Sequence, residues 1–373
     1  MNKTKDQIQK EAGDAIDDLQ CSGVVISMGV GKTRVGLKDM IINYTDYTKY
    51  LVVTPTTKIQ ISWLEEMVSS KCGYLKDSIT FSTYRSLTKQ SQDYDVIYLD
   101  ECHSLKKSHE KWLDAFVAKG GRIVGLTGTY PVYMGSEKGK LCAKFCPKVY
   151  SYETDEAVED NILNNYEIVV HKLKLSEKRD IAKKGKHGEF FSSEKKDYDY
   201  WSSVLDEAVN PADVQRLRLQ RMKVLQGFKT KLRYSKVLLE RQKDKTLIFV
   251  STKAQADLIC KHSVYSGKKS SDTNLEKFKS GEINKLSAID QLSEGVNIPN
   301  LKVGIINHAY ANNRKSAQKI GRFLRLNPNE KSTIHVLCYE NSVDKGWVEQ
   351  SLESFDSKNI KWISPMLYEG IDY

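Results

Sequence analysis

The stretch Ile26-Ser27-Met28-Gly29-Val30-Gly31-Lys32-Thr33 follows a short apolar run and precedes a segment with the composition of a helix. Glycines allow backbone N–H groups to turn toward an anion, and a following helix directs its positive end to the same place. The order of apolar run, glycines, Lys-Thr and helix therefore predicts a strand, a phosphate-binding loop and a helix. A parallel α/β fold is the usual setting for such a loop.

The residues of this loop have separate predicted tasks. We expect Lys32 to contact the β- and γ-phosphates of a nucleotide and Thr33 to offer its hydroxyl to Mg²⁺. The phosphates would be surrounded by the backbone of Gly29, Val30 and Gly31. The common pattern G-x-x-x-x-G-K-[ST] has a glycine where this chain has Ile26, so the loop alone does not exclude a chance match.

Residues 5–19 carry apolar side chains at near-helical spacing, which predicts a helix directly before the first strand. Gln7 and Gln9 lie on this helix. Either side chain could reach the edge of an adenine base, although glutamines are also common on exposed helix surfaces. Gln9 is the candidate for contact with the nucleotide.

Two adjacent acids follow another apolar run, Tyr94–Leu99. Asp100 and Glu101 would lie at the carboxyl end of a buried strand, where two carboxylates are costly unless a cation or a reacting water uses them. We therefore expect Asp100 to hold Mg²⁺ and Glu101 to polarise the attacking water. A third apolar run ends in the turn Thr127-Gly128-Thr129, whose hydroxyls could hydrogen-bond the acidic loop.

Composition limits the class of protein. A chain of 373 residues suits two domains, and 40% hydrophobic with 28% charged residues is typical of a globular protein. No apolar run approaches the ~20 residues that span a bilayer, and the first residues are polar, so we expect no membrane contact and a cytoplasmic location. The seven cysteines are scattered and odd in number, which favours buried thiols over disulfides or a zinc site.

The positive charge is concentrated in one segment. The net charge is +10, and residues 216–245 contain eleven lysines and arginines against two acids. Such a run predicts a polyanionic partner, with Arg218 and Arg221 as candidate contacts. A solvated helix face is the alternative explanation.

Alternating strand and helix patterns divide the chain. Residues 1–150 predict a parallel α/β domain with its site at the carboxyl ends of the strands. A second α/β unit completes residues 151–373. Within it, Ser176–Trp201 shows no clear period and predicts a loop, and helical spacing with basic residues returns over Asp213–Leu239. We therefore expect a mobile loop and basic helical insertion over residues 176–242.

Taken in order, the short motifs resemble those of superfamily 2 helicases and translocases, and the resemblance covers nearly the whole chain. The first-domain matches are Met28–Thr33 for motif I in its Snf2-like form, Val53–Thr56 with Trp63 for Ia, Ser82–Tyr84 for Ib, Asp100-Glu101-Cys102-His103 for II and Leu126–Thr129 for III. The second-domain matches are Phe249–Thr252 for motif IV, Ser293–Pro299 for V and Gln318–Arg325 for VI.

The resemblance implies two RecA-like domains in tandem, with ATP and Mg²⁺ in the cleft between them and nucleic acid across their tops. It implies a catalytic role for Gln318 and makes Arg322 and Arg325 arginine fingers that reach motif I of the opposite domain. The nucleic-acid contacts expected from these motifs are Thr54, Thr56, Thr83, Ser251, Thr252 and Ser293. The basic segment, with Arg218 and Arg221, would add grip beside them.

The function expected from this resemblance is that of an ATP-dependent DNA helicase or translocase. The compact layout is most similar to that of bacteriophage members, which act in replication, recombination or repair. The expected partner is single-stranded, duplex or branched DNA, with replication or recombination proteins as further candidates, and the chain is expected to be a monomer. Two alternatives stay open: an RNA-dependent ATPase of the same architecture, and a nucleic-acid clamp in which ATP only switches affinity.

Overall fold

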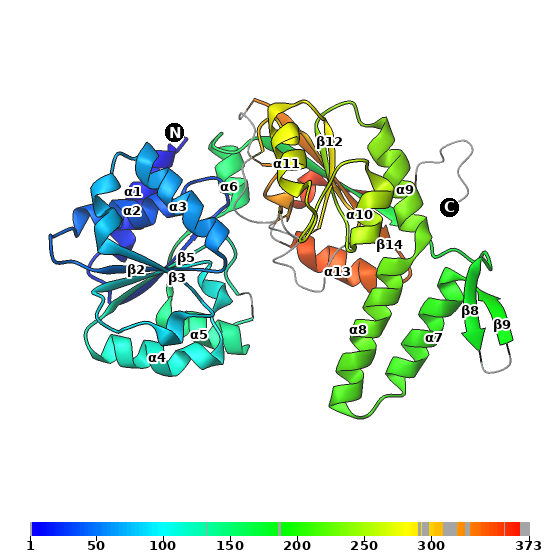
Figure 1. The fold of residues 1–373 in the computed structure, drawn as a ribbon, viewed down its shortest axis with the longest axis horizontal. Helices are drawn as coiled ribbons and strands as arrows, with labels where there is room; N and C mark the ends of the chain where they lie inside the picture. The colour runs from blue at the N-terminus through cyan, green and yellow to red at the C-terminus, as the bar shows by residue number, and fades with distance from the viewer. Residues whose placement is uncertain are drawn as a thin grey trace. The chain divides into compact units, whose positions relative to one another are not determined.

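The computed structural model describes residues 2–131, 133–185, 188–289, 292, 298–308, 319–324, 329–353 and 355–365. The chain divides into two compact units (Figure 1). The first contains Met1–Asn165, and the second contains most of the chain that follows.

The first unit is built on a six-stranded sheet with the order β3-β2-β4-β5-β1-β6. Every neighbouring pair in it is parallel. The strands are β1 (Cys21–Ile26), β2 (Tyr50–Thr54), β3 (Ile79–Thr83), β4 (Val96–Asp100), β5 (Arg122–Thr127) and β6 (Lys148–Tyr152). The central strands are almost continuously buried because helices cover both faces of the sheet.

Helices α1 (Lys5–Ile16), α2 (Lys32–Ile42) and α3 (Thr57–Ser69) lie on one face of this sheet, and α4 (Lys107–Ala118) and α5 (Glu137–Phe145) on the other (Figure 1). A short helix, α6 (Thr154–Glu159), follows the last strand. The core under α4 and α5 includes Leu99, Leu113 and Phe145. On the opposite face, Arg122 donates two hydrogen bonds to the Asp39 carboxylate, at 2.9 and 3.0 Å, and so ties β5 to α2.

The second unit contains a seven-stranded sheet with the order β11-β12-β10-β13-β14-β7-β15. Its strands are β7 (Asn165–Leu173), β10 (Thr246–Phe249), β11 (Ser263–Val264), β12 (Lys285–Ala288), β13 (Val303–Ile306), β14 (Lys331–Tyr339) and β15 (Ile360–Ile363). Around the sheet lie α9 (Lys229–Arg241), α10 (Lys253–Ile259), α11 (Ser271–Ser280) and α13 (Val343–Leu352). The two units therefore match the expected pair of parallel-sheet domains.

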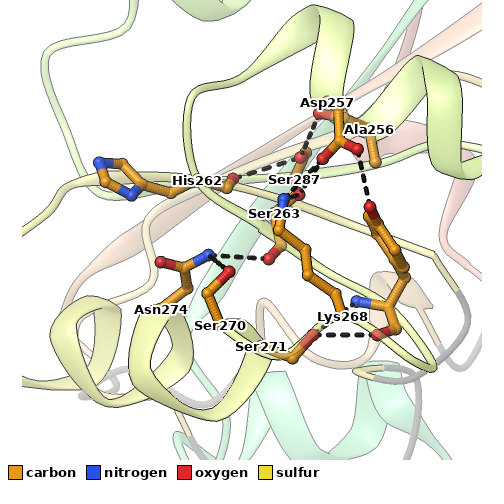
Figure 2. Close-up of polar contacts among 10 residues, drawn as sticks. Ala256, Asp257, His262, Ser263, Lys268, Ser270, Ser271, Asn274 and Ser287 are labelled. Carbon is orange, nitrogen blue, oxygen red and sulfur yellow. Dashed lines mark hydrogen bonds and ion pairs between the residues drawn. The ribbon is translucent and has the colours of Figure 1, made fainter.

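A network of side-chain hydrogen bonds lies at the β11 edge of this sheet (Figure 2). The Asp257 carboxylate accepts hydrogen bonds from Ser263 Oγ at 2.6 Å, Tyr265 OH at 2.7 Å and Lys268 Nζ at 2.7 Å. The bonds from Lys268, Ser263 and Tyr265 lower the pKa of Asp257 to about 2. Asn274 donates to the backbone oxygen of Ser263 at 3.0 Å, which fixes α11 to the same strand.

An arm extends from the second unit between β7 and α9 (Figure 1). We define it as the antiparallel ribbon of β8 (Ile181–Gly185) and β9 (Gly188–Ser192) together with α7 (Glu194–Asp206) and α8 (Pro211–Gly227). The loop expected over Ser176–Trp201 is therefore wrong. The ribbon depends on cross-strand pairing that no periodicity in one strand reveals, and Ser193 starts α7 by accepting a hydrogen bond from Lys196 N.

The helical expectation for Asp213–Leu239 is confirmed, although the chain breaks at Phe228 into α8 and α9. The sequence pattern missed β6 and β15, which are short, partly exposed edge strands. None of the helices in the described ranges is long and apolar enough to cross a membrane.

Candidate active site

The loop between β1 and α2 has the backbone geometry that its glycines allow. Gly29 has φ 93° and Gly31 has φ 110°, which L side chains rarely adopt. Gly31 caps α2, and the first N–H groups of a helix have no partners within it. The loop therefore presents backbone donors at the start of an eleven-residue helix. Ile26, the departure from the common pattern, is the last residue of β1 and is fully buried.

Gln9 braces this loop from α1. Its Nε2 donates to the backbone oxygen of Val30 at 3.1 Å, and its Oε1 is buried without a hydrogen-bond partner in the described part of the chain. A Cβ at Gly31 would lie 2.6 Å from Gln9 Nε2. Glycine at position 31 thus permits both the backbone conformation and the close approach of Gln9.

An ion pair joins the loop to the acidic turn. Lys32 Nζ lies 2.6 Å from Glu101 Oε1, and the two side chains are 12% and 11% exposed. Since β5 lies between β1 and β4 in the sheet, the lysine crosses the carboxyl end of β5. Gly128 follows β5, and a Cβ there would lie 3.1 Å from Lys32 Nζ. A side chain at position 128 would crowd the Lys32 ammonium group, so glycine leaves room for the lysine to reach Glu101.

The Glu101 carboxylate has further partners. Thr127 Oγ1 lies 3.2 Å from its Oε2, and His103 Nδ1 lies 3.4 Å from the same oxygen. These contacts confirm that the Thr127 turn bonds the acidic loop. Burial alone would raise the pKa of Glu101, but Lys32, His103 and the hydrogen bonds outweigh it and hold that pKa at about 2. Glu101 also has φ 52°, an uncommon conformation for a residue with a side chain.

Asp100 ends β4 and is almost fully buried. Its Oδ2 accepts a hydrogen bond from Trp63 Nε1 of α3 at 2.9 Å. Burial and the neighbouring Glu101 charge raise the pKa of Asp100 to about 6. The two adjacent carboxylates thus have pKa values moved in opposite directions, as in sites where two acids have different roles. Sequence reasoning placed Trp63 in a motif but missed this contact.

The residues present fit a magnesium ion bound together with phosphate. Within the described ranges, no group of three or more His, Cys, Asp or Glu residues could hold a metal unaided. Mg²⁺ is commonly held by one or two carboxylates and the phosphates of a substrate. Asp100 supplies a buried carboxylate and Thr33 a hydroxyl at the start of α2.

The expected nucleic-acid contacts of the first unit divide by exposure. Thr54 is fully buried, and its Oγ1 donates to the backbone oxygen of Thr56 at 2.9 Å. Thr54 is the last residue of β2, and its hydroxyl is used within the turn to Thr56, so a nucleic-acid contact at this position stays a prediction. Thr56 is exposed and Thr83 is half-buried, so both remain candidates.

Two candidates in the second unit support α10. The N–H of Ser251 donates to Gln255 Oε1 at 3.1 Å, and Thr252 Oγ1 accepts from Gln255 N at 3.2 Å. The Thr252 hydroxyl therefore caps α10, whereas the Ser251 hydroxyl is buried without a partner in the described ranges. Arg322 is described and is buried. Three other candidates lie outside the described residues: Ser293, Gln318 and Arg325.

The basic segment 216–245 is not one uniform surface. Arg218 is exposed on α8, while Arg221 is half-buried with its guanidinium carbon 6.0 Å from the centre of the Tyr198 ring. Lys231 is fully buried in an ion pair with Asp344. Counting charge along the sequence overestimated the basic surface because it could not distinguish exposed lysines from buried ones.

Comparison with known proteins is consistent with this geometry. The family described as "Type III restriction enzyme, res subunit" matches residues 2–132, and the family described as "Helicase conserved C-terminal domain" matches residues 229–327. A curated relative, the DNA 3'-5' translocase XPB2 of Sulfurisphaera tokodaii, is 24% identical over 358 residues. That match covers 84% of this chain and 77% of the relative.

Solved structures share the fold. An ATP-dependent Type ISP restriction-modification enzyme, LlaBIII, bound to DNA, superimposes with a TM-score of 0.61 at 12% identity, covering 98% of this chain and 31% of the enzyme's length. Dbp5 of S. cerevisiae, bound to RNA and ADP BeF3, superimposes with a TM-score of 0.59 at 13% identity, covering 96% of this chain and 90% of Dbp5. The two parallel-sheet units are therefore tandem RecA-like domains. The chain belongs to the superfamily 2 helicases and translocases, enzymes that hydrolyse ATP and act on nucleic acids.

Proposed function

We propose that this protein is a DNA translocase or helicase whose ATP site is built on the loop between β1 and α2. The observation that carries this proposal is the Lys32–Glu101 pair of 2.6 Å, with Asp100 beside it at the end of β4. The lysine of a phosphate-binding loop and two carboxylates of different pKa meet at the carboxyl ends of neighbouring parallel strands.

In this proposal Lys32 exchanges partners. A phosphate arriving at the loop would compete with Glu101 for the lysine ammonium group. The released Glu101 carboxylate could then orient the attacking water and accept its proton, while Thr127 holds the second carboxylate oxygen. Asp100 and Thr33 would hold Mg²⁺, which when bound neutralises charge on the phosphates.

The remaining roles follow the family resemblance. Arg322 and Arg325 would stabilise charge on the transferring phosphoryl group, with Gln318 beside them, and Gln9 Oε1 would accept a hydrogen bond from the adenine amino group. DNA would be held through its phosphates by Thr56, Thr83, Ser251 and Ser293. Exposed basic residues of α8 such as Arg218 would add a salt-sensitive grip.

DNA is proposed over RNA because the relative found by sequence is named a DNA translocase, whereas the structural resemblance includes proteins bound to either polymer. Roles in replication, recombination or repair, and a bacteriophage setting, rest on the compact motif layout alone.

The decisive experiment measures ATP hydrolysis with single-stranded DNA, duplex DNA, forked DNA and RNA of matched length. We expect DNA to stimulate turnover more than RNA. Greater stimulation by RNA would make the chain an RNA-dependent ATPase, and ATP-dependent binding without turnover would make it a clamp. Strand displacement and triplex displacement, run on the stimulating DNA, would then separate unwinding from translocation.

A further inference from the structure

The β8–β9 ribbon of the arm exposes two adjacent phenylalanines. Phe190 is 52% exposed and Phe191 is 63% exposed. The other eight of the chain's ten phenylalanines, all within the described residues, are buried or half-buried. Removing an aromatic ring from water is favourable, so a partner that covers these rings would gain stability.

The two rings lie on opposite faces of the ribbon. Phe190 pairs with Lys183 and Phe191 with Ala182 in the antiparallel register, and consecutive residues of a strand point to opposite faces. A Cβ at Gly185 would lie 3.2 Å from the Phe190 ring, so the absence of a side chain there leaves room for the ring on that face. Bases could therefore approach a ring from either side of the ribbon.

The base of the ribbon is held firmly on the second unit. The Asp197 carboxylate of α7 accepts a hydrogen bond from Ser192 Oγ at 2.6 Å and pairs with Lys183 Nζ at 2.6 Å. Ile181 packs against the core of the unit together with Leu175. A lone two-stranded ribbon is marginally stable in water, so these contacts are what keep the two rings in position.

The charge around the ribbon is positive. Residues 178–197 contain seven lysines and arginines against four acids, one of them the Asp197 that pairs with Lys183. One of those acids, Glu194, is buried and accepts a hydrogen bond from Thr230 N at 2.9 Å, so it does not face a ligand. Aromatic rings among basic residues are the combination that binds single-stranded nucleic acid, where bases stack on rings and cations hold the backbone.

We propose that the ribbon binds unpaired nucleobases by stacking on Phe190 and Phe191. This inference rests on the proposed action on DNA and names the form of DNA that this surface takes. A protein partner lying on one face of the ribbon would leave the other ring in water, whereas bases of a single strand can stack on both sides. Duplex DNA, whose bases are already stacked, gains nothing from the rings.

The test is the variant F190A/F191A, measured by fluorescence anisotropy against a labelled single-stranded oligothymidine and a duplex of equal length. Each ring that is removed should lower the affinity for the single strand at least about fivefold, so the double variant should lose at least about 25-fold. Its affinity for the duplex should stay unchanged. The salt dependence of binding should not change, because both substitutions leave the phosphate-binding cations in place. F190Y/F191Y keeps two stacking rings and should restore the affinity.

Y47A is the matched control, because Tyr47 is an exposed aromatic residue of the first unit at 90% exposure. It should bind the single strand as the unaltered chain does. Equal single-strand affinity for F190A/F191A and the unaltered chain, or a flattened salt slope, would overturn the stacking proposal. If the unaltered chain shows DNA-stimulated ATP hydrolysis in that case, the proposed function stands; if it binds no nucleic acid at all, both proposals fail.

Discussion

Lys32 in the first unit and Lys231 in the second both lie buried against a carboxylate, Glu101 and Asp344 respectively. Their surroundings differ. The Lys32 and Glu101 side chains keep 12% and 11% of their surface exposed beside a loop of backbone donors, whereas those of Lys231 and Asp344 keep 1% and 4%. A ligand can reach the first pair and not the second.

The partners of the carboxylates differ as well. Glu101 stands next to a second carboxylate, Asp100, so one lysine faces two acids. In the second pair, Asp344 Oδ2 also accepts the Tyr339 N–H at 2.7 Å, and the Lys231 ammonium lies 4.8 Å from the Tyr339 ring centre. The comparison shows that a buried ion pair indicates neither catalysis nor stability until its remaining neighbours are known.

The largest expected effect is that of Lys32→Ala. We expect this change to abolish ATP hydrolysis, because it removes the charge beside the phosphates. Lys38→Ala is the control, since Lys38 lies on the same helix and pairs at the surface with Asp6. Steady-state turnover with DNA present checks the prediction, and turnover that persists in Lys32→Ala would refute the assignment of the site.

Lys231→Met should act on stability. Removing one partner of a buried pair leaves the Asp344 charge uncompensated, at a cost of about 3–5 kcal/mol in the free energy of unfolding. The double variant K231M/D344L should recover part of this loss, because no charge of this pair remains buried, although the Tyr339 N–H then loses its acceptor. Urea unfolding measures both. If Lys231→Met is as stable as the unaltered chain, the Asp344 charge is not costly without its partner. The contrast between a buried structural pair and an accessible active-site pair would then fail.

These pairs also show what the sequence could predict. The places of Gly31, Lys32 and Asp100 in the fold were predictable because a phosphate loop and an acidic strand end need fixed residue types at fixed spacing. The burial of Lys231 was not predictable, because charge was counted along a helix whose buried side was unknown. The ribbon that carries Phe190 and Phe191 was missed because its strands gain stability from each other and from Asp197, not from an apolar alternation.

A neutral pair in the second unit should respond to pH. His171 Nε2 lies 3.0 Å from His335 Nδ1, and His171 Nδ1 lies 2.7 Å from Tyr234 OH. Burial lowers the pKa of His171 to about 3 and that of His335 to about 4. Both are then neutral in the folded chain at pH 5, while in the unfolded chain they bind protons below about pH 6.5.

The unfolded state therefore gains protons first, and the unfolding free energy should fall as the pH drops from about 6.5 toward 4. The expected slope is up to ~1.4 kcal/mol per pH unit for each histidine. His335→Gln should remove one of the two contributions, as measured by urea unfolding at pH 7 and pH 5. A variant with the full slope would show that His335 is not part of the response.

The smallest expected effect separates exposed from buried members of the basic segment. Arg216, Arg218 and Lys223 are exposed on α8. Changing all three to glutamine should weaken DNA binding and reduce the salt slope by up to ~0.9 for each phosphate that the variant no longer neutralises. Lys231→Met, in the same run of sequence, should leave that slope unchanged because its ammonium group never reaches solvent.

Three exposed lysines of the first unit, Lys10, Lys111 and Lys119, give a control with the same reduction of net charge. If their change to glutamine flattens the salt slope as much as the α8 variant does, binding follows total charge and α8 is not a specific contact. If only the α8 variant flattens it, the DNA path crosses the arm. The arm would then supply a phosphate grip on α8, while the ribbon supplies the separate, salt-insensitive contact to bases.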